Sequence, residues 1–204
     1  MAADADLILA SASARRRDLL RSAGITFEVQ PSDVPEDAGA DESPIDFARR
    51  VARDKALQVA AQRRGRGDTR PVLGADTIVV IDDLTIGKPR DRNHARQMLE
   101  RLSSRTHRVV TAVCVILADG AEVRRTVTTE VTFGALDPAE IERYLDRADW
   151  RDKAGAYAVQ EHAAYMVREV RGSYTNVVGL PLCETIEALR DAGLCALRDG
   201  GPHA

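Results

Sequence analysis

Two long runs rich in β-branched residues stand on either side of the dipeptide Asp119-Gly120, and they limit what this chain can fold into. The first run, HRVVTAVCVILAD, ends at Asp119, and the second, AEVRRTVTTEVTF, follows Gly120. An Asp-Gly pair between two such runs is a strong hairpin signal, because its backbone tolerates the positive φ angles of a tight turn. We therefore expect two long antiparallel strands, and a sheet that is not purely parallel.

Strand-like and helix-like segments alternate along the rest of the chain. We expect strands at 7–11, 25–30, 71–83 and 84–89, and helices at about 14–23, 44–64, 91–104, 138–147 and 181–192. This order predicts an α/β fold with a mixed, twisted sheet that contains antiparallel strands and is flanked by helices. The 204 residues, 44% of them hydrophobic, suit a single domain over 1–204 or two lobes that share a core. The core should span about 7–192, and 195–204 should form a frayed tail.

The net charge and the cysteine pattern indicate which class of ligand and which cellular compartment to expect. A net charge of -3 gives no general attraction for nucleic acid or for an anionic membrane, so we expect a small ligand. Cys114, Cys183 and Cys195 are far apart, without a Cys-x-x-Cys pair or a zinc-like spacing. The N-terminal residues do not follow the signal-peptide pattern, and no run approaches the roughly 20 apolar residues that cross a bilayer. We therefore expect a cytoplasmic protein.

Arg15, Arg16 and Arg17 stand at the start of the first expected helix, where Ser13 is the N-cap. Basic residues there oppose the positive end of the helix dipole. Two of them lie four positions before leucines, and so lean toward the apolar face of the helix. A phosphate bound by arginines and free helix amides would resolve the conflict. The alternative is a solvated basic turn.

Two buried positions carry charges that an apolar environment opposes. Lys55 lies four residues after Val51 on the inward stripe of the second helix, either as a ligand or with its ammonium extended to solvent. Asp76, followed by Thr77, interrupts an apolar strand. A buried carboxylate must be paired, hydrogen-bonded or bound to a metal, so Asp76 is the strongest catalytic candidate. Its alternative is a carboxylate held by backbone amides near Gly74.

Three further residues complete the candidate site. Lys88 lies between Gly87 and a proline at a strand end, and Glu36 lies in a polar loop. Cations beside carboxylates suggest a polyphosphate with Mg²⁺ or Mn²⁺, because Mg²⁺ is held by one or two carboxylates and by phosphate oxygens. Gln160 can donate and accept hydrogen bonds, which suits the edge of a nucleobase, although it can equally cap a strand end.

Five segments place the chain beside a known family. LILASASARRRDLL, GADTIVV, IGKPRD, DKAGAYAVQ and GSYTNVVGLPL occur in the order and approximate spacing of the Maf proteins, which the sequence resembles over about 7–192. These are nucleoside triphosphate pyrophosphatases first named for an effect on septum formation. The resemblance implies two lobes around a cleft, a divalent cation, a homodimer and the conversion of a triphosphate to a monophosphate and pyrophosphate.

The resemblance also assigns roles to residues of this chain. GADT, followed by DKAGAY and a Gln, resembles the branch that acts on dTTP and UTP rather than the branch that acts on methylated GTP. It implies that Asp76 is the proton acceptor, and that Arg15, Thr77 and Gln160 influence specificity. Glu161 and His162 follow Gln160, whereas many members have Gly at the position of Glu161.

We therefore expect a triphosphate to lie across a cleft, with its phosphates on Ser11, Ser13, the first-helix amides, Arg16, Lys55 and Lys88. Asp76, together with Glu36, should hold the metal. Asp76 either accepts the proton of the attacking water or orients a water that the metal activates. Other functions remain open, namely a pyrophosphatase for ITP, XTP or methylated GTP, or a nucleotide-binding regulator of cell division without turnover.

Overall fold

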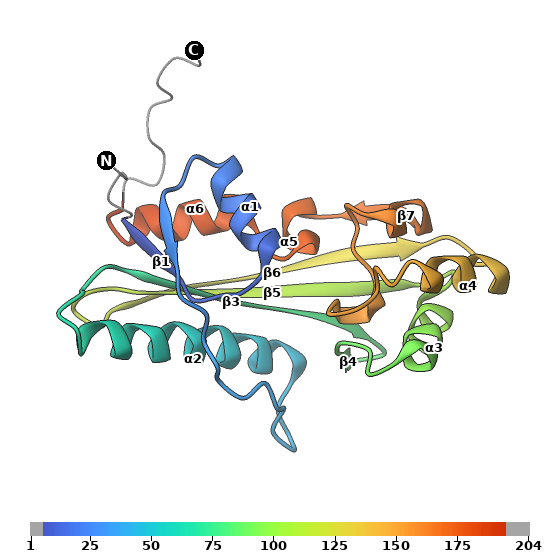
Figure 1. Cartoon of the computed structure of the whole chain (residues 1–204), viewed down its shortest axis with the longest axis horizontal. Helices are drawn as coiled ribbons and strands as arrows, with labels where there is room; N and C mark the ends of the chain where they lie inside the picture. The colour runs from blue at the N-terminus through green and yellow to red at the C-terminus, as the bar shows by residue number, and fades with distance from the viewer. Residues whose placement is uncertain (1–5, 195–204) are drawn as a thin grey trace, which may run out of the picture.

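The computed structural model describes residues 6–194, which form one mixed sheet with helices on both faces (Figure 1). The strands are β1 Leu7–Leu9, β2 Phe27–Val29, β3 Val72–Ile81, β4 Leu84–Ile86, β5 Thr106–Ile116, β6 Glu122–Phe133 and β7 Val167–Arg171. The helices are α1 Ala14–Ser22, α2 Pro44–Arg64, α3 Arg92–Leu102, α4 Pro138–Asp146, α5 Tyr174–Val178 and α6 Leu182–Asp191, with short 3-10 turns at η1 Ala154–Ala156 and η2 His162–Met166. The expected tail at 195–204 lies outside the described residues.

The strand order is β2-β1-β3-β5-β6-β7, with β4 beside β3. β1 pairs in parallel with β2 and β3, and the other pairings are antiparallel. The predicted hairpin is confirmed, because β5 and β6 stay in register from Thr106 opposite Thr132 to Ile116 opposite Glu122. The predicted mixed α/β architecture is confirmed as well.

α2 lies against β3 at very short range. It covers one face of the sheet, and α1, α5 and α6 cover the other (Figure 1). A Cβ added to Gly74 would lie 2.2 Å from the backbone oxygen of Ala52 and 2.8 Å from the backbone nitrogen of Ala56. Only a glycine therefore allows this approach, and it sets how closely the side chains of α2 approach β3.

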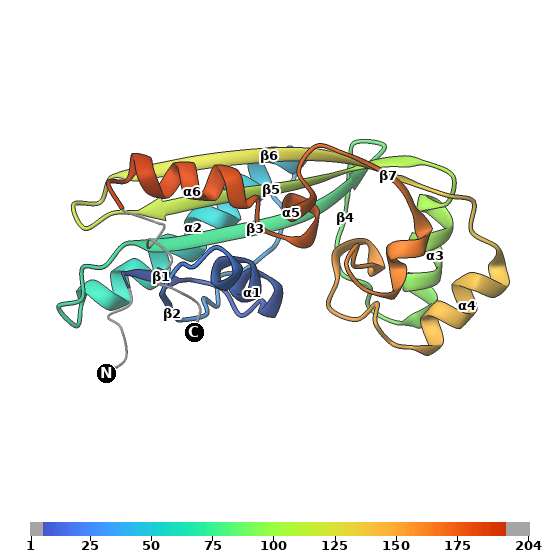
Figure 2. The same cartoon turned by 90° about the horizontal axis from the view of Figure 1, so that it is seen from above.

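The long strands β3, β5 and β6 connect two hydrophobic regions. Near one end, residues of β1 and α6 such as Leu9 and Leu189 pack on β3. Near the other end, Leu99 of α3, Leu145 of α4 and Trp150 pack around Phe133 of β6. Figure 2 shows the two groups of elements at opposite ends of the sheet. This is the arrangement of two lobes that the resemblance implied.

A break in strand pairing separates the two regions along one edge of β3. β1 pairs with β3 only at Val72 and Leu73, and β4 pairs with it only from Val79 to Ile81. The residues between them, including Asp76 and Thr77, therefore have no strand beside them on that edge. Binding sites in α/β proteins form where such strand ends leave a crevice.

Membrane-spanning helices are absent from the part of the chain that the structure describes, because none of its helices is both long and apolar enough to cross a bilayer.

Candidate functional site

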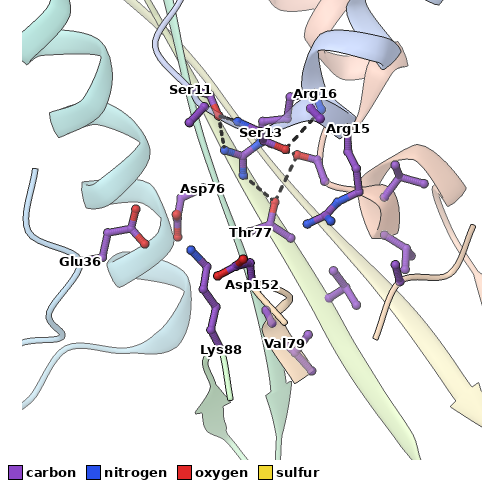
Figure 3. A pocket seen from close by; sticks show the side chains of 18 of the residues that line it. Ser11, Ser13, Arg15, Arg16, Glu36, Asp76, Thr77, Val79, Lys88 and Asp152 are labelled. Atoms are coloured by element: carbon purple, nitrogen blue, oxygen red, sulfur yellow. Dashed lines mark hydrogen bonds between the residues drawn. The ribbon is translucent and has the colours of Figure 1, made fainter. Parts of the chain in front are cut away.

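A cavity of about 520 Å³ opens at the break along β3. Every site residue predicted from the sequence lines it: Ser11, Ser13, Arg15, Arg16, Glu36, Lys55, Asp76, Thr77, Lys88 and Gln160. Glu36, Asp76, Lys88 and Asp152 point toward a common space in Figure 3, and Arg15 extends on the other side of Thr77 in this view. The fold thus gathers residues that are spread over about 150 positions of sequence.

The N-terminus of α1 forms one wall. Ser13 is its N-cap, as predicted, and its hydroxyl accepts a hydrogen bond from the Arg16 amide at 3.4 Å. The Ser11 hydroxyl accepts one from the Ser13 amide at 3.3 Å. The first turn contains no acidic residue, so an anion bound there would meet free amides and the positive end of the helix dipole.

The guanidinium of Arg16 is buried and directed at protein oxygens. Its Nε donates to the Gly179 carbonyl at 2.9 Å, and Nη1 donates to the Ala75 carbonyl at 2.9 Å and to the Ser11 hydroxyl at 3.1 Å. Nη2 donates to the Thr77 hydroxyl at 3.0 Å. A guanidinium has five N–H donors, so one remains for a ligand. Four donors of Arg16 thus contact protein oxygens, which leaves one N–H, together with the charge, for a phosphate.

Lys55 connects two carboxylates from different elements. Its Nζ lies 2.8 Å from Asp76 Oδ1 and 2.6 Å from Glu36 Oε1. Lys55 and Asp76 are only 8% and 6% exposed. Burial raises the pKa of Glu36, but the hydrogen bond and charge of Lys55, with the charges of Lys88 and Arg16, lower that pKa further, so the net shift is downward. The Glu36 carboxylate is thus held ionised beside the buried side chain of Lys55.

The Asp76 and Glu36 carboxylates suit a metal ion whose other ligands are water and substrate phosphates. Among the described residues, no group of three His, Cys, Asp or Glu side chains is placed to hold a metal, and no hydrogen bond reaches Asp76 Oδ2 or Glu36 Oε2. Mg²⁺ is commonly bound by one or two carboxylates, by water and by substrate phosphates. The free oxygens of Asp76 and Glu36 fit such an ion, provided that a phosphate completes its coordination.

Asp152 belongs to the site, although the sequence did not single it out. It lines the cavity and has a positive φ of 59°, a conformation uncommon outside glycine. Gly155 and Ala156, with φ of 70° and 62°, follow in the same segment. Clustered unusual backbone is typical of functional segments, but a sequence does not display it.

The same segment places Gln160 at the rim of the cavity. Glu161, whose role the sequence left open, pairs with Lys153 at 2.9 Å. His162 Nδ1 lies 2.6 Å from Asp149 Oδ2. These two contacts join the residues directly after Gln160 to Lys153 and Asp149, which precede it. Gln160 itself is exposed, and its side chain makes no hydrogen bond to the described residues. Its amide is therefore available to a ligand.

Apolar side chains line the part of the cavity beyond Thr77. They are Val79, Val109, Ala154, Tyr157, Ala158, Val177 and Val178. The cavity thus has a charged region, with Lys55, Lys88, Asp76 and Glu36, and an apolar region. Such a division suits a ligand that has a polyanionic part and a flat apolar part.

His107, which does not line the cavity, contacts the cavity residue Tyr157. Its Nε2 lies 2.7 Å from the Tyr157 hydroxyl, and its Nδ1 is buried and has no hydrogen-bond partner among residues 6–194. The two rings meet edge to face, and each meets Phe133 in the same way. Burial lowers the pKa of His107 to about 4 and raises that of Tyr157. Both rings are therefore neutral in the folded protein near pH 7.

The buried His107 should make stability depend on pH. Below about pH 6.5 the unfolded chain binds a proton at this ring, and the folded protein does so only near pH 4. The free energy of unfolding should therefore fall by about 3 kcal/mol as the pH drops through this window. Between pH 6.5 and 5, where ordinary carboxylates stay ionised, His107→Gln should show a clearly shallower decline in urea unfolding. An unchanged slope in this variant would assign the pH dependence to other groups.

The fold and the cavity define a class of protein: an α/β protein with a site for a small ligand that is polyanionic at one end. Comparison with known proteins agrees with this class. The family model described as "Maf-like protein" matches residues 6–192. The chain belongs to the Maf-like protein family.

Two curated relatives illustrate the similarity. A protein of Geobacter sulfurreducens named dTTP/UTP pyrophosphatase is 49% identical over 189 residues, which cover 92% of this chain and 96% of the relative. A protein of Anaeromyxobacter dehalogenans with the same name is 48% identical, over 92% of this chain and 94% of its own. A solved nucleoside-triphosphatase, described as a dITP/XTP pyrophosphatase, from Mycobacterium abscessus matches 64% of this chain and 74% of its own. Its TM-score of 0.39 and 17% identity are too low to support an argument.

Proposed function

We propose that this protein hydrolyses dTTP and UTP to the monophosphate and pyrophosphate, and so removes these nucleotides from the pool. One observation carries the proposal: a single cavity joins the α1 N-terminus and the Lys55–Asp76–Glu36 cluster to an apolar region bordered by Gln160. A triphosphate fits the charged region, and a nucleobase fits the apolar one. The names of the relatives at 48–49% identity support the same activity.

The phosphates should bind between the α1 N-terminus and the lysines. Ser11, Ser13 and the free amides of α1 bind one part of the triphosphate, and Lys55 and Lys88, which line the same cavity, bind another. Arg16 contributes its charge and its remaining N–H. The leaving pyrophosphate gains negative charge as the bond breaks, so these cations stabilise the transition state more than the substrate.

Asp76 is the proposed proton acceptor. A water attacks the α-phosphorus, the bond from that phosphorus to the bridging oxygen breaks, and pyrophosphate leaves with the bond electrons. The proton of the water passes to Asp76 Oδ2, the oxygen that no hydrogen bond occupies, while Lys55 fixes Oδ1 at 2.8 Å. In the alternative role, Asp76 Oδ2 and the free oxygen of Glu36 would hold Mg²⁺ or Mn²⁺, which would supply charge neutralisation at the phosphates, and Asp76 would orient the attacking water in place of accepting its proton.

Base selection is assigned to the apolar region and its rim. The free amide of Gln160 can pair with the imide edge of uracil or thymine, which presents both a donor and acceptors. Arg15 also lines the cavity. A base with the wrong polar edge would leave a desolvated amide unpaired, which disfavours binding more strongly than shape alone.

A nucleotide panel with pyrophosphate detection tests this function. dTTP and UTP should be converted fastest, and EDTA should abolish the reaction because the phosphates lose their cation. The panel includes ITP, XTP and methylated GTP. A higher rate with one of these would assign the enzyme to another nucleotide, and tight nucleotide binding without product over hours in Mg²⁺ or Mn²⁺ would favour a regulator.

We also propose that the protein acts in the cytoplasm and forms a homodimer. Cys114 and Cys183 are free thiols, which supports a reducing compartment. The homodimer rests on the family resemblance, and light scattering in solution tests it directly.

A further inference from the structure

Two hydroxyl groups, a half-buried one on Thr77 and a buried one on Thr111, connect Arg16 to the α5 wall of the cavity. The Thr77 hydroxyl accepts from Arg16 Nη2 and lies 2.9 Å from the Thr111 hydroxyl on the neighbouring strand β5. Each of the two also reaches a carbonyl of the segment at α5. Thr77 is 3.2 Å from the Gly179 oxygen, and Thr111 is 3.2 Å from the Asn176 oxygen. Thr111 and Asn176 are completely buried.

Protein acceptors compete for the proton of the Thr77 hydroxyl. The two hydroxyls carry two protons, and three contacts compete for them: the contact between the hydroxyls, and one contact to each carbonyl. The protein acceptors within reach of the Thr77 proton are the Thr111 hydroxyl and the Gly179 carbonyl. The hydroxyl of Thr77 therefore influences the shape of the cavity through its contacts with Thr111 and with the Gly179 carbonyl.

The two carbonyls belong to α5 and the residue that follows it, which form part of the apolar region of the cavity. α5 carries Val177 and Val178 into the cavity wall, and Gly179 follows with a φ of 130°. Asn176 fastens α5 further, because its Nδ2 donates to the Val109 carbonyl at 3.0 Å and to the Thr129 hydroxyl at 2.9 Å. The position of this wall relative to Arg16 and Thr77 thus depends on the Thr111 hydroxyl.

We propose that Thr111 is a positioning residue for base selection: its hydroxyl, which does not line the cavity, fixes the distance between the α5 wall and β3 and so the width of the space for a pyrimidine. The inference rests on the proposed function. It places a determinant of specificity on β5, one strand away from the cavity edge of β3.

Thr111→Val tests the inference, because valine keeps the shape and removes the hydroxyl. KM for dTTP and UTP should rise about tenfold, the effect of one buried hydrogen bond, while kcat changes less than about twofold. The advantage of pyrimidine over purine triphosphates should shrink by a similar factor. Thr111→Ser keeps the hydroxyl and should retain the wild-type preference, whereas Thr111→Ala should lose it. The Ser and Ala pair gives an answer even if the valine variant does not fold.

Thr132→Val is the matched control. Thr106 and Thr132 form another hydroxyl pair, at 2.8 Å, where β5 begins and β6 ends, outside the cavity lining. This control should keep the wild-type ranking. A uniform loss of kcat/KM for all nucleotides in Thr111→Val, with a lower unfolding temperature, would overturn the inference, as would an unchanged ranking. A wild-type protein that converts no nucleotide would overturn the proposed function and the inference together, whereas a pyrimidine-selective wild type with an unaffected variant overturns the inference alone.

Discussion

Asp76→Asn should lower the rate of pyrophosphate release by about a thousandfold while leaving the fold intact. The amide has the shape of the carboxylate but cannot accept the proton of the attacking water, and general-base catalysis typically contributes 10²- to 10⁴-fold. The fold should persist because the Lys55 ammonium keeps its contact with Glu36 at 2.6 Å. Steady-state kinetics with dTTP, together with thermal unfolding, measure the two effects separately.

Asp83→Asn is the control for the loss of a negative charge. Asp83 lies in the exposed turn between β3 and β4, pairs with Arg108 at 2.6 Å and has a φ of 56°, which asparagine also tolerates. Its activity should match that of the wild type. Near-normal turnover by Asp76→Asn would remove Asp76 from the mechanism.

Gly74→Ala should lower the free energy of unfolding by about 3 kcal/mol, the upper part of the range for an overpacked core. The added methyl group would lie 2.2 Å from the Ala52 oxygen and 2.9 Å from the Ala56 Cβ, and neither atom can rotate away. α2 would have to retreat from β3, and Lys55 would retreat with it. We therefore expect kcat to fall as well, because the 2.8 Å contact between Lys55 and Asp76 depends on this approach.

Gly65→Ala separates this effect from the general cost of replacing a glycine. Gly65 ends the same helix with a right-handed φ of -60°, and a Cβ there would meet its nearest neighbours at an ordinary 3.6 Å. Stability should change little or rise slightly. If urea unfolding gave Gly74→Ala the same stability as Gly65→Ala, α2 would not be in close contact with β3 at Gly74.

Most of the fold could be predicted from local patterns. The β5–β6 hairpin and the caps of α1 follow from turn chemistry and periodicity, which act over a few residues. The helix α5 could not be predicted from local patterns. Its sequence, YTNVV, is rich in β-branched residues, which favour strands, yet it forms a short helix in the structure. Tertiary contacts decide such a segment: Asn176 is completely buried and fixed to β5 and β6 by hydrogen bonds.

Most residues of the site could be predicted, but Asp152 was missed, and the contacts between the site residues could not be predicted. Charges in apolar stretches identified Lys55 and Asp76, since a buried charge needs a partner. The sequence did not show that they pair with each other, because nothing local fixes how α2 is placed over β3. Arg16 was expected to bind phosphate, yet four of its donors bond protein oxygens. Backbone carbonyls have no signature in a sequence, so this outcome was out of reach.

The contact of Arg16 with Gly179 has a consequence for biosynthesis. The two residues are 163 positions apart, so Gly179 must leave the ribosome long after Arg16 before this guanidinium can meet its acceptor. Contacts of such long range form late in folding. A nascent chain, or a fragment cut before Gly179, therefore carries the conspicuous N-terminal arginines but not a completed binding site.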